Sequence, residues 1–189
     1  SVRNVVTLNV GAIEPRTILY GEILTGTPQR RFAVADYRAN RVSVIDATSF
    51  NITNTFTAAD GINNPTAIAF GIGTFGGALR SVFAITNEGN NTVTIIDLSA
   101  ATPTIIGNVT VVGSRPYAIA FGSFVTPAGA IVRRFATANR GTVPGTGSIN
   151  LIDANATINS PNSVINIFAN VQDDPLAIAF GDSYFGFAT

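Results

Sequence analysis

The chain has 189 residues, enough for one domain with a substantial core, and 46% of them are hydrophobic. Only 12% are charged, and eleven basic residues balance eleven acidic ones, so no long-range field attracts nucleic acid or an anionic membrane. Cysteine, histidine, methionine and tryptophan are absent, which excludes disulfides, thiolate zinc sites, imidazole bases and cysteine nucleophiles. We expect no cofactor, and the near-zero net charge favours self-association.

The start of the chain bears on where the protein works. A chain that begins Ser-Val and has no methionine is expected to be a processed mature protein or part of a longer one. Removal of a secretion signal is the simpler expectation, so we predict an extracellular or cell-surface location. No run approaches the roughly 18 apolar residues of a membrane-spanning helix, and we predict no membrane span.

In chain order, the first predicted element is a lone strand at residues 1–11, SVRNVVTLNVG. The next unit, residues 12–62, contains four short apolar phrases: PRTILYG, RRFAVAD, RVSVIDA and ITNTFTA. Each phrase is rich in Val, Ile, Thr or Phe and is bounded by turn-forming residues, which predicts strands rather than helices. The unit is therefore predicted to be four antiparallel strands.

The same order of phrases returns twice and then begins again. Residues 63–113 and 114–172 form the second and third units, and residues 173–189 begin a fourth. The opening prolines, Pro15, Pro65, Pro116 and Pro175, are 50, 51 and 59 residues apart. We predict one all-β domain, a β-propeller-like array of four-stranded antiparallel blades with about three complete blades and a split or partial fourth. Ile68, Phe70, Ile119, Phe121, Ile178 and Phe180, from the opening phrases, are predicted core residues.

Two longer stretches, FAVADYRANRVSVIDATS and VFAITNEGNNTVTIIDLSA, carry a resemblance to a known family. They resemble the YVTN-type β-propeller repeats of bacterial and archaeal surface proteins, and the resemblance extends over nearly the whole chain. Such repeats imply a scaffold rather than an activity. The units here are longer than a compact repeat of this kind, mainly between the first and second strands.

Three carboxylates occupy one position in successive units: Asp46, Asp97 and Asp153. A ring of carboxylates could bind a metal or act on a substrate. An Asp at a strand end also accepts main-chain N–H groups and starts a turn, and we expect this structural role. We therefore predict no catalytic residue and no metal site. Asp36, Asn87 and Asn139, which follow the second strand of each unit, suit turns in the same way.

Two sets of loops are candidate interaction sites, on opposite faces of an up-and-down blade. One face carries the charged residues Arg38, Arg115 and Arg140, with mixed signs around them. The other carries apolar residues of the connectors between first and second strands: Ile23, Leu24, Phe75, Leu79, Phe124 and Val125. These apolar residues are expected either to extend the hairpins and pack together or to meet another protein. The arginines that close the connectors, Arg31, Arg80 and Arg134, are expected to lie over their apolar rim.

The two ends of the chain are predicted to be complementary strands. Val5, Val6, Leu8 and Val10 belong to the lone first strand, while Tyr184, Phe185 and Phe187 belong to the unfinished last unit. Exposed sheet edges of this kind invite pairing. Within one molecule the pairing would close a four-bladed ring, and between molecules it would give a larger ring or a filament.

These observations favour a non-catalytic extracellular scaffold that contacts itself or another surface protein. Two alternatives stay open: part of a larger propeller enzyme of the lactonase type, and a carbohydrate-binding propeller. A lactonase-type propeller needs carboxylates that are free to hold a cation, and carboxylates are scarce in this chain. A carbohydrate-binding propeller needs aromatic rings on which a sugar can stack, and the chain has four tyrosines and no tryptophan.

Overall fold

The computed structural model describes residues 14–23, 29–111, 113–126, 128–155, 164–169, 174–180 and 185–188. These residues form fourteen β-strands and one short 3-10 helix, Ala58–Asp60. None of the helical structure among them is long and apolar enough to cross a membrane. The predicted lone strand, with Val5, Val6, Leu8 and Val10, lies outside the described residues, as do Leu24 and Tyr184.

The strands form three sheets of four strands and one of two. The first sheet contains β1 (Pro15–Ile23), β2 (Gln29–Asp36), β3 (Arg41–Asp46) and β4 (Ile52–Phe56). The second contains β5 (Pro65–Phe75), β6 (Ala78–Asn87), β7 (Thr92–Asp97) and β8 (Thr104–Thr110). The third contains β9 (Pro116–Val125), β10 (Ile131–Asn139), β11 (Ser148–Asp153) and β12 (Val164–Ala169), and the last contains β13 (Ala177–Phe180) and β14 (Phe185–Ala188).

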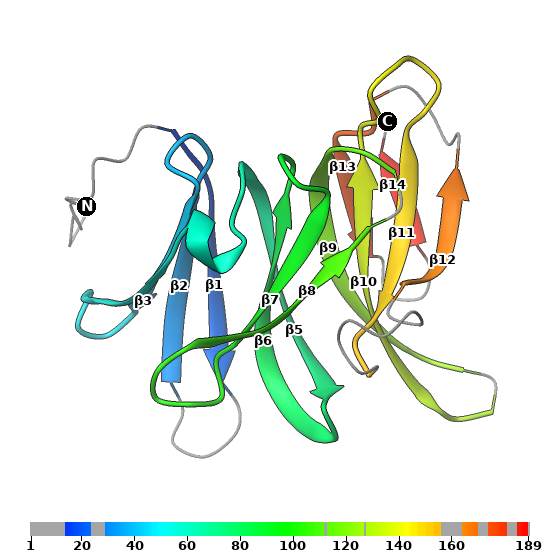
Figure 1. Cartoon of the computed structure of the whole chain (residues 1–189). Helices are drawn as coiled ribbons and strands as arrows, with labels where there is room; N and C mark the ends of the chain where they lie inside the picture. The colour runs from blue at the N-terminus through cyan, green and yellow to red at the C-terminus, as the bar shows by residue number, and fades with distance from the viewer. Residues whose placement is uncertain are drawn as a thin grey trace, which may run out of the picture.

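Neighbouring strands in every sheet are antiparallel and follow chain order. The predicted all-β class and the four-stranded antiparallel sheets are therefore confirmed. The first strands of consecutive sheets contact one another, β1 with β5, β5 with β9, and β9 with β13 (Figure 1). The described strands make an open array with the first sheet at one end, and they do not close into a ring.

A repeated contact between aromatic rings and glycine sets the spacing of the sheets. A methyl group on Gly21 of β1 would lie 2.5 Å from Phe70 and 2.9 Å from Phe83 of the second sheet. A methyl group on Gly71 of β5 would likewise overlap Phe121 and lie 2.7 Å from Phe135 of the third sheet. Because a side chain there would displace the rings, the glycine that ends each opening phrase lets the next sheet approach closely.

The same contact recurs between the third sheet and the last one. Gly122 of β9 lies against the ring of Phe180 in β13, where an added methyl group would overlap the ring. The phrase ending Phe-Gly therefore has two roles in the second and third units. Its aromatic residue packs on the preceding sheet, and its glycine receives the aromatic residue of the following sheet.

Two apolar cores fill the spaces between the first three sheets. Ile68 and Phe83 of the second sheet pack against the first sheet, while Ile119 and Phe135 of the third pack against the second. Ile68 and Ile119 are buried, as predicted from the repeated phrase. Phe70 and Phe121 are partly buried and pack against these cores, and Ile178 and Phe180 are also partly buried.

A buried arginine also ties the first sheet to the second. Arg31 is only 3% exposed, and its guanidinium donates to the main-chain carbonyls of Ala101 at 2.7 Å and Ala100 at 3.3 Å. Burial lowers the pKa of this guanidinium. The prediction that Arg31 lies over an apolar rim is wrong, because those carbonyls, in the loop before β8, are hydrogen-bond acceptors within its reach.

We expect Gly71→Ala to destabilise the protein by about 1 to 3 kcal/mol through overpacking against Phe121 and Phe135. Phe121→Ala alone removes a packed ring and lowers stability by about 3 kcal/mol. In the double variant the added methyl group has room, so the combined loss falls short of the sum by about 1 kcal/mol. Urea unfolding of the four proteins measures this coupling, and simple additivity would contradict the proposed contact.

Arg31→Ala should lower the free energy of unfolding by about 1.5 to 3 kcal/mol, because the hydrogen bonds that the buried guanidinium donates to the second sheet are lost. The matched control is the neighbouring Arg30→Ala. The Arg30 side chain is 60% exposed and bonds Glu22 at the surface. Its removal should leave the free energy of unfolding almost unchanged. Equal losses in chemical unfolding would refute the assigned role of Arg31.

Candidate interaction surfaces

The repeated carboxylates cap turns at the ends of β3, β7 and β11. Asp46 accepts hydrogen bonds from the main-chain N–H of Ser49 at 2.7 Å and of Thr48 at 2.9 Å. Asp97 accepts one from Ser99 N and Asp153 one from Asn155 N, each at 2.8 Å. The first of these bonds is the main reason that the pKa of Asp46 lies below its ordinary value. The predicted turn-starting role of the three carboxylates is thus what the structure describes.

Two of these carboxylates also bind an arginine from the adjacent strand of their own sheet. Arg134 donates to Asp153 at 2.8 Å, and Arg80 donates to Asp97. The sequence analysis did not predict that these arginines form ion pairs. Each lies beside a carboxylate that the antiparallel pairing brings next to it, and the charges neutralise each other.

The polar residues that end β2, β6 and β10 bond within their own sheets. Asn87 donates to Thr94 at 2.8 Å, and Asn139 donates to Asn150 at 3.0 Å. Asp36 accepts from Arg41 at 3.0 Å. Among the described residues, no group of three or more Asp or Glu side chains is placed to hold a metal ion.

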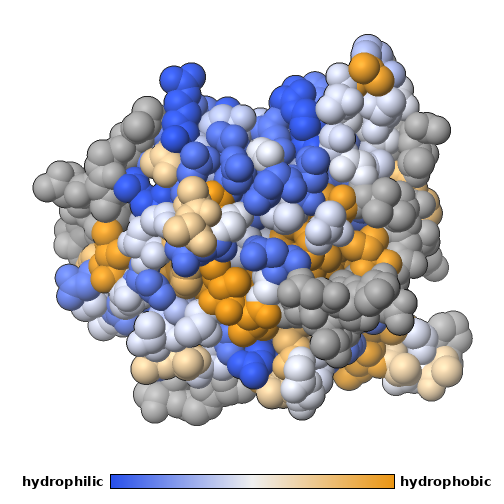
Figure 2. Space-filling view, viewed as in Figure 1, coloured by the Kyte–Doolittle hydropathy of each residue, from blue (hydrophilic) through white to orange (hydrophobic). Residues whose placement is uncertain are grey.

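The turns after β2, β6 and β10 lie on the upper side in Figure 1, opposite the β5–β6 and β9–β10 hairpins. Figure 2 shows hydrophilic residues gathered along this upper edge, while hydrophobic residues gather lower down between the sheets. The upper surface carries the three predicted arginines, Arg38, Arg115 and Arg140. We call it the turn face.

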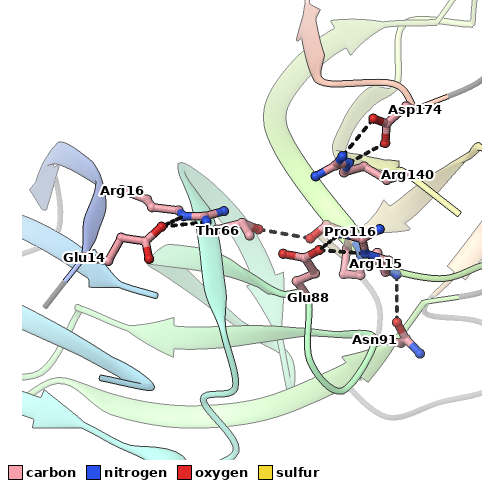
Figure 3. Close-up of polar contacts among 9 residues, drawn as sticks. All are labelled: Glu14, Arg16, Thr66, Glu88, Asn91, Arg115, Pro116, Arg140 and Asp174. Atoms are coloured by element: carbon pink, nitrogen blue, oxygen red, sulfur yellow. Dashed lines mark hydrogen bonds and ion pairs between the residues drawn. The ribbon is translucent and has the colours of Figure 1, made fainter. Parts of the chain in front are cut away.

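Each of those arginines is paired with a carboxylate. Arg115 bonds Glu88 at 2.6 Å, which joins the third sheet to the second, and Arg140 bonds Asp174, which joins the third sheet to the segment before β13 (Figure 3). Arg38 bonds Glu14 at 2.7 Å. Two of these three ion pairs therefore link successive sheets, and the Arg38–Glu14 pair lies within the first unit.

An asparagine in two of these turns also links its sheet to the following one. Asn40 accepts from the main-chain N–H of Asn64 at 2.7 Å, and its counterpart Asn91 accepts from that of Arg115 at 2.8 Å (Figure 3). Both asparagines have positive φ angles, 48° and 57°, a conformation that Asn tolerates better than most residues. The same asparagine bond therefore links the first sheet to the second and the second sheet to the third.

A small open pocket of about 230 Å³ lies on the turn face beside residues 141–144. Arg115, Arg140 and Asp174 line it. Both guanidinium groups already bond a carboxylate, so the pocket has no excess of positive charge that would favour an anion.

The apolar connector residues divide into two groups. Ile23 and Phe75 are 1% and 2% exposed, so the first of the two alternatives, residues that extend the hairpins and pack, is confirmed for them. They belong to β1 and β5, which extend further than predicted, and they join the cores between sheets. Leu79, Phe124 and Val125 are 52%, 38% and 66% exposed and do lie at hairpin ends.

The first sheet has an exposed apolar face that the sequence pattern did not single out. Ile18 is 64% exposed and Tyr20 is 42% exposed, although both belong to a regular strand. Phe32 of β2 lies beside Tyr20, with the ring centroids 5.5 Å apart. We call these three residues the leading face, because their counterparts in later sheets pack on the preceding sheet. One sequence feature could have indicated this exposure. The phrase PRTILYG has Tyr where the later phrases have Phe, and a tyrosine hydroxyl favours contact with water.

Comparison with models of known protein families finds no match for this chain, and comparison with curated protein sequences finds none.

We expect Asp46→Asn to reduce stability at neutral pH by less than about 1 kcal/mol, since the carboxylate is near the surface. A carboxylate with a lowered pKa stabilises the fold above its unfolded-state pKa, near 3.9, and loses this effect as the pH falls through the folded-state pKa. The difference in the free energy of unfolding between wild type and variant should therefore shrink as the pH is lowered. Urea unfolding from about pH 7 down to about pH 2 measures it. A gap independent of pH would contradict the assignment.

Proposed function

We propose that this chain is a non-catalytic scaffold of the β-propeller type, which acts by contacting proteins, including further copies of itself. The sheets resemble blades in their up-and-down order and in the contact of their first strands. An extracellular or cell-surface location is part of the proposal, on the strength of the resemblance to surface-protein repeats.

The observation that carries this proposal is the structural use of the repeated polar residues. Asp46, Asp97 and Asp153 bond main-chain groups, and the arginines of the turn face bond carboxylates. A catalytic or metal-binding carboxylate must instead direct free oxygens at a substrate or cation. The arrangement therefore supports a scaffold better than the lactonase-type or carbohydrate-binding alternatives.

The last sheet supports self-assembly. It consists of β13 and β14, whereas the other three sheets have four strands. Among the described strands, β14, which contains Phe185 and Phe187, pairs only with β13, so its other edge is unpaired. An unpaired edge is a template for a strand from another chain. The proposed partner for this edge is the strand predicted at residues 1–11.

The test is analytical ultracentrifugation of the full chain at increasing concentration, followed by negative-stain microscopy. We expect species larger than a monomer, as rings or filaments. Deletion of residues 1–10 should reduce assembly without loss of the β-sheet circular-dichroism signal. A chain that stays monomeric at high concentration would overturn self-assembly.

A parallel assay addresses the enzyme alternative. The full chain, with and without added Ca²⁺, is incubated with lactone and ester substrates, and Asp97→Asn serves as the control. We expect no turnover above background. Hydrolysis that disappears in the variant would replace the scaffold with an enzyme.

A further inference from the structure

The leading face of the first sheet is the exposed version of an interface that the molecule builds twice internally. Three aromatic pairs occupy the same register: Tyr20 with Phe32, Phe70 with Phe83, and Phe121 with Phe135. Their ring centroids are 5.5, 5.9 and 5.0 Å apart, so the pair has nearly the same form in each sheet.

The three pairs differ in what covers them. Phe83 and Phe135 are fully buried, and each lies against a glycine of the preceding sheet, Gly21 or Gly71. Tyr20 is 42% exposed. Ile18 is 64% exposed, whereas its counterpart Ile68 is 5% exposed. The first sheet therefore presents an aromatic pair and an isoleucine in the arrangement that elsewhere receives a preceding sheet.

The last sheet presents the complementary surface. Ile178 and Phe180 of β13 point toward the third sheet, where Phe180 packs on Gly122. Side chains alternate along a strand, so Ala177 and Ala179 point to the opposite side, and both are exposed. Ala69, the counterpart of Ala179 in β5, is 6% exposed because the third sheet covers it. We call the surface of Ala177 and Ala179 the trailing face.

We propose that the leading face of one copy docks on the trailing face of a second copy, so that copies stack head to tail and continue the sheet-on-sheet packing found within each chain. This inference rests on the self-assembly proposed above and assigns its contact surface. The large side chains Ile18, Tyr20 and Phe32 would meet the small side chains of β13, which repeats the large-on-small packing of the internal interfaces. Such fit favours close packing.

The position of the two faces explains why the partner is a second copy. They belong to the two end sheets of an open array, so they do not cover each other within the described molecule. A contact between unlike faces is heterologous, and each added copy exposes the same leading face again. A face-to-face dimer of two leading faces would instead press two aromatic pairs together with no small residue opposite.

The experiment places a charge on each face separately. Ile18→Asp charges the leading face and Ala179→Asp the trailing face, and ultracentrifugation of the full chain measures assembly. Each variant alone should weaken self-association by about tenfold or more, because the interface would bury an unpaired charge. Val143→Asp, at a 58% exposed position in the turn after β10, is the matched control and should assemble like wild type.

Mixing separates the possible outcomes. The Ile18→Asp variant retains an unaltered trailing face, and the Ala179→Asp variant retains an unaltered leading face. These two faces can bind each other, so an equimolar mixture should form a dimer containing one copy of each. Formation of this dimer also shows that both variants are folded. Assembly unaffected by Ala179→Asp would leave self-association in place and overturn the head-to-tail contact. A monomeric wild type would overturn the proposed self-assembly itself.

Discussion

The packing of an aromatic pair on a glycine of the preceding sheet is the constraint on which the rest of this structure depends. At Gly21, Gly71 and Gly122 a single methyl group would overlap the rings of the next sheet. Close approach at these points lets isoleucine, valine and alanine from facing sheets form continuous cores. It also fixes the register in which each sheet meets its neighbour, so the polar contacts at the turns recur at equivalent positions.

The positions of the ion pairs depend on this register. A chain with few charges and no net charge uses most of those seen on the turn face to link one sheet to the next or to close a turn. Glu88 shows this well, because its side chain is 6% exposed and bonds Arg115 of the following sheet. Buried or half-buried partners of this kind favour one arrangement over others, and they leave little free charge for binding an ionic ligand.

In an array built from one repeated interface, the two end sheets differ from the internal ones. Each internal sheet is covered on both sides, whereas each end sheet retains one surface that has the chemistry of a core. Ile18 and Tyr20 at one end and Ala177 and Ala179 at the other are such surfaces. In the proposed head-to-tail assembly, copies join by the same packing that joins the sheets of one chain, and the proposed scaffold function is a property of the repeat rather than of a localised site.

The repeated phrases by themselves determined the strand content, the four-strand unit and the order of strands, because alternation, β-branched residues and turn formers are local signals. They also indicated the turn-capping role of Asp46, Asp97 and Asp153. Only the tertiary structure decided that Ile23 and Phe75 are buried, that Arg31 reaches the carbonyls of the next sheet, and that Ile18 and Tyr20 are exposed. These properties depend on which sheet lies opposite, and residues with the same local sequence context are buried or exposed according to that neighbour alone.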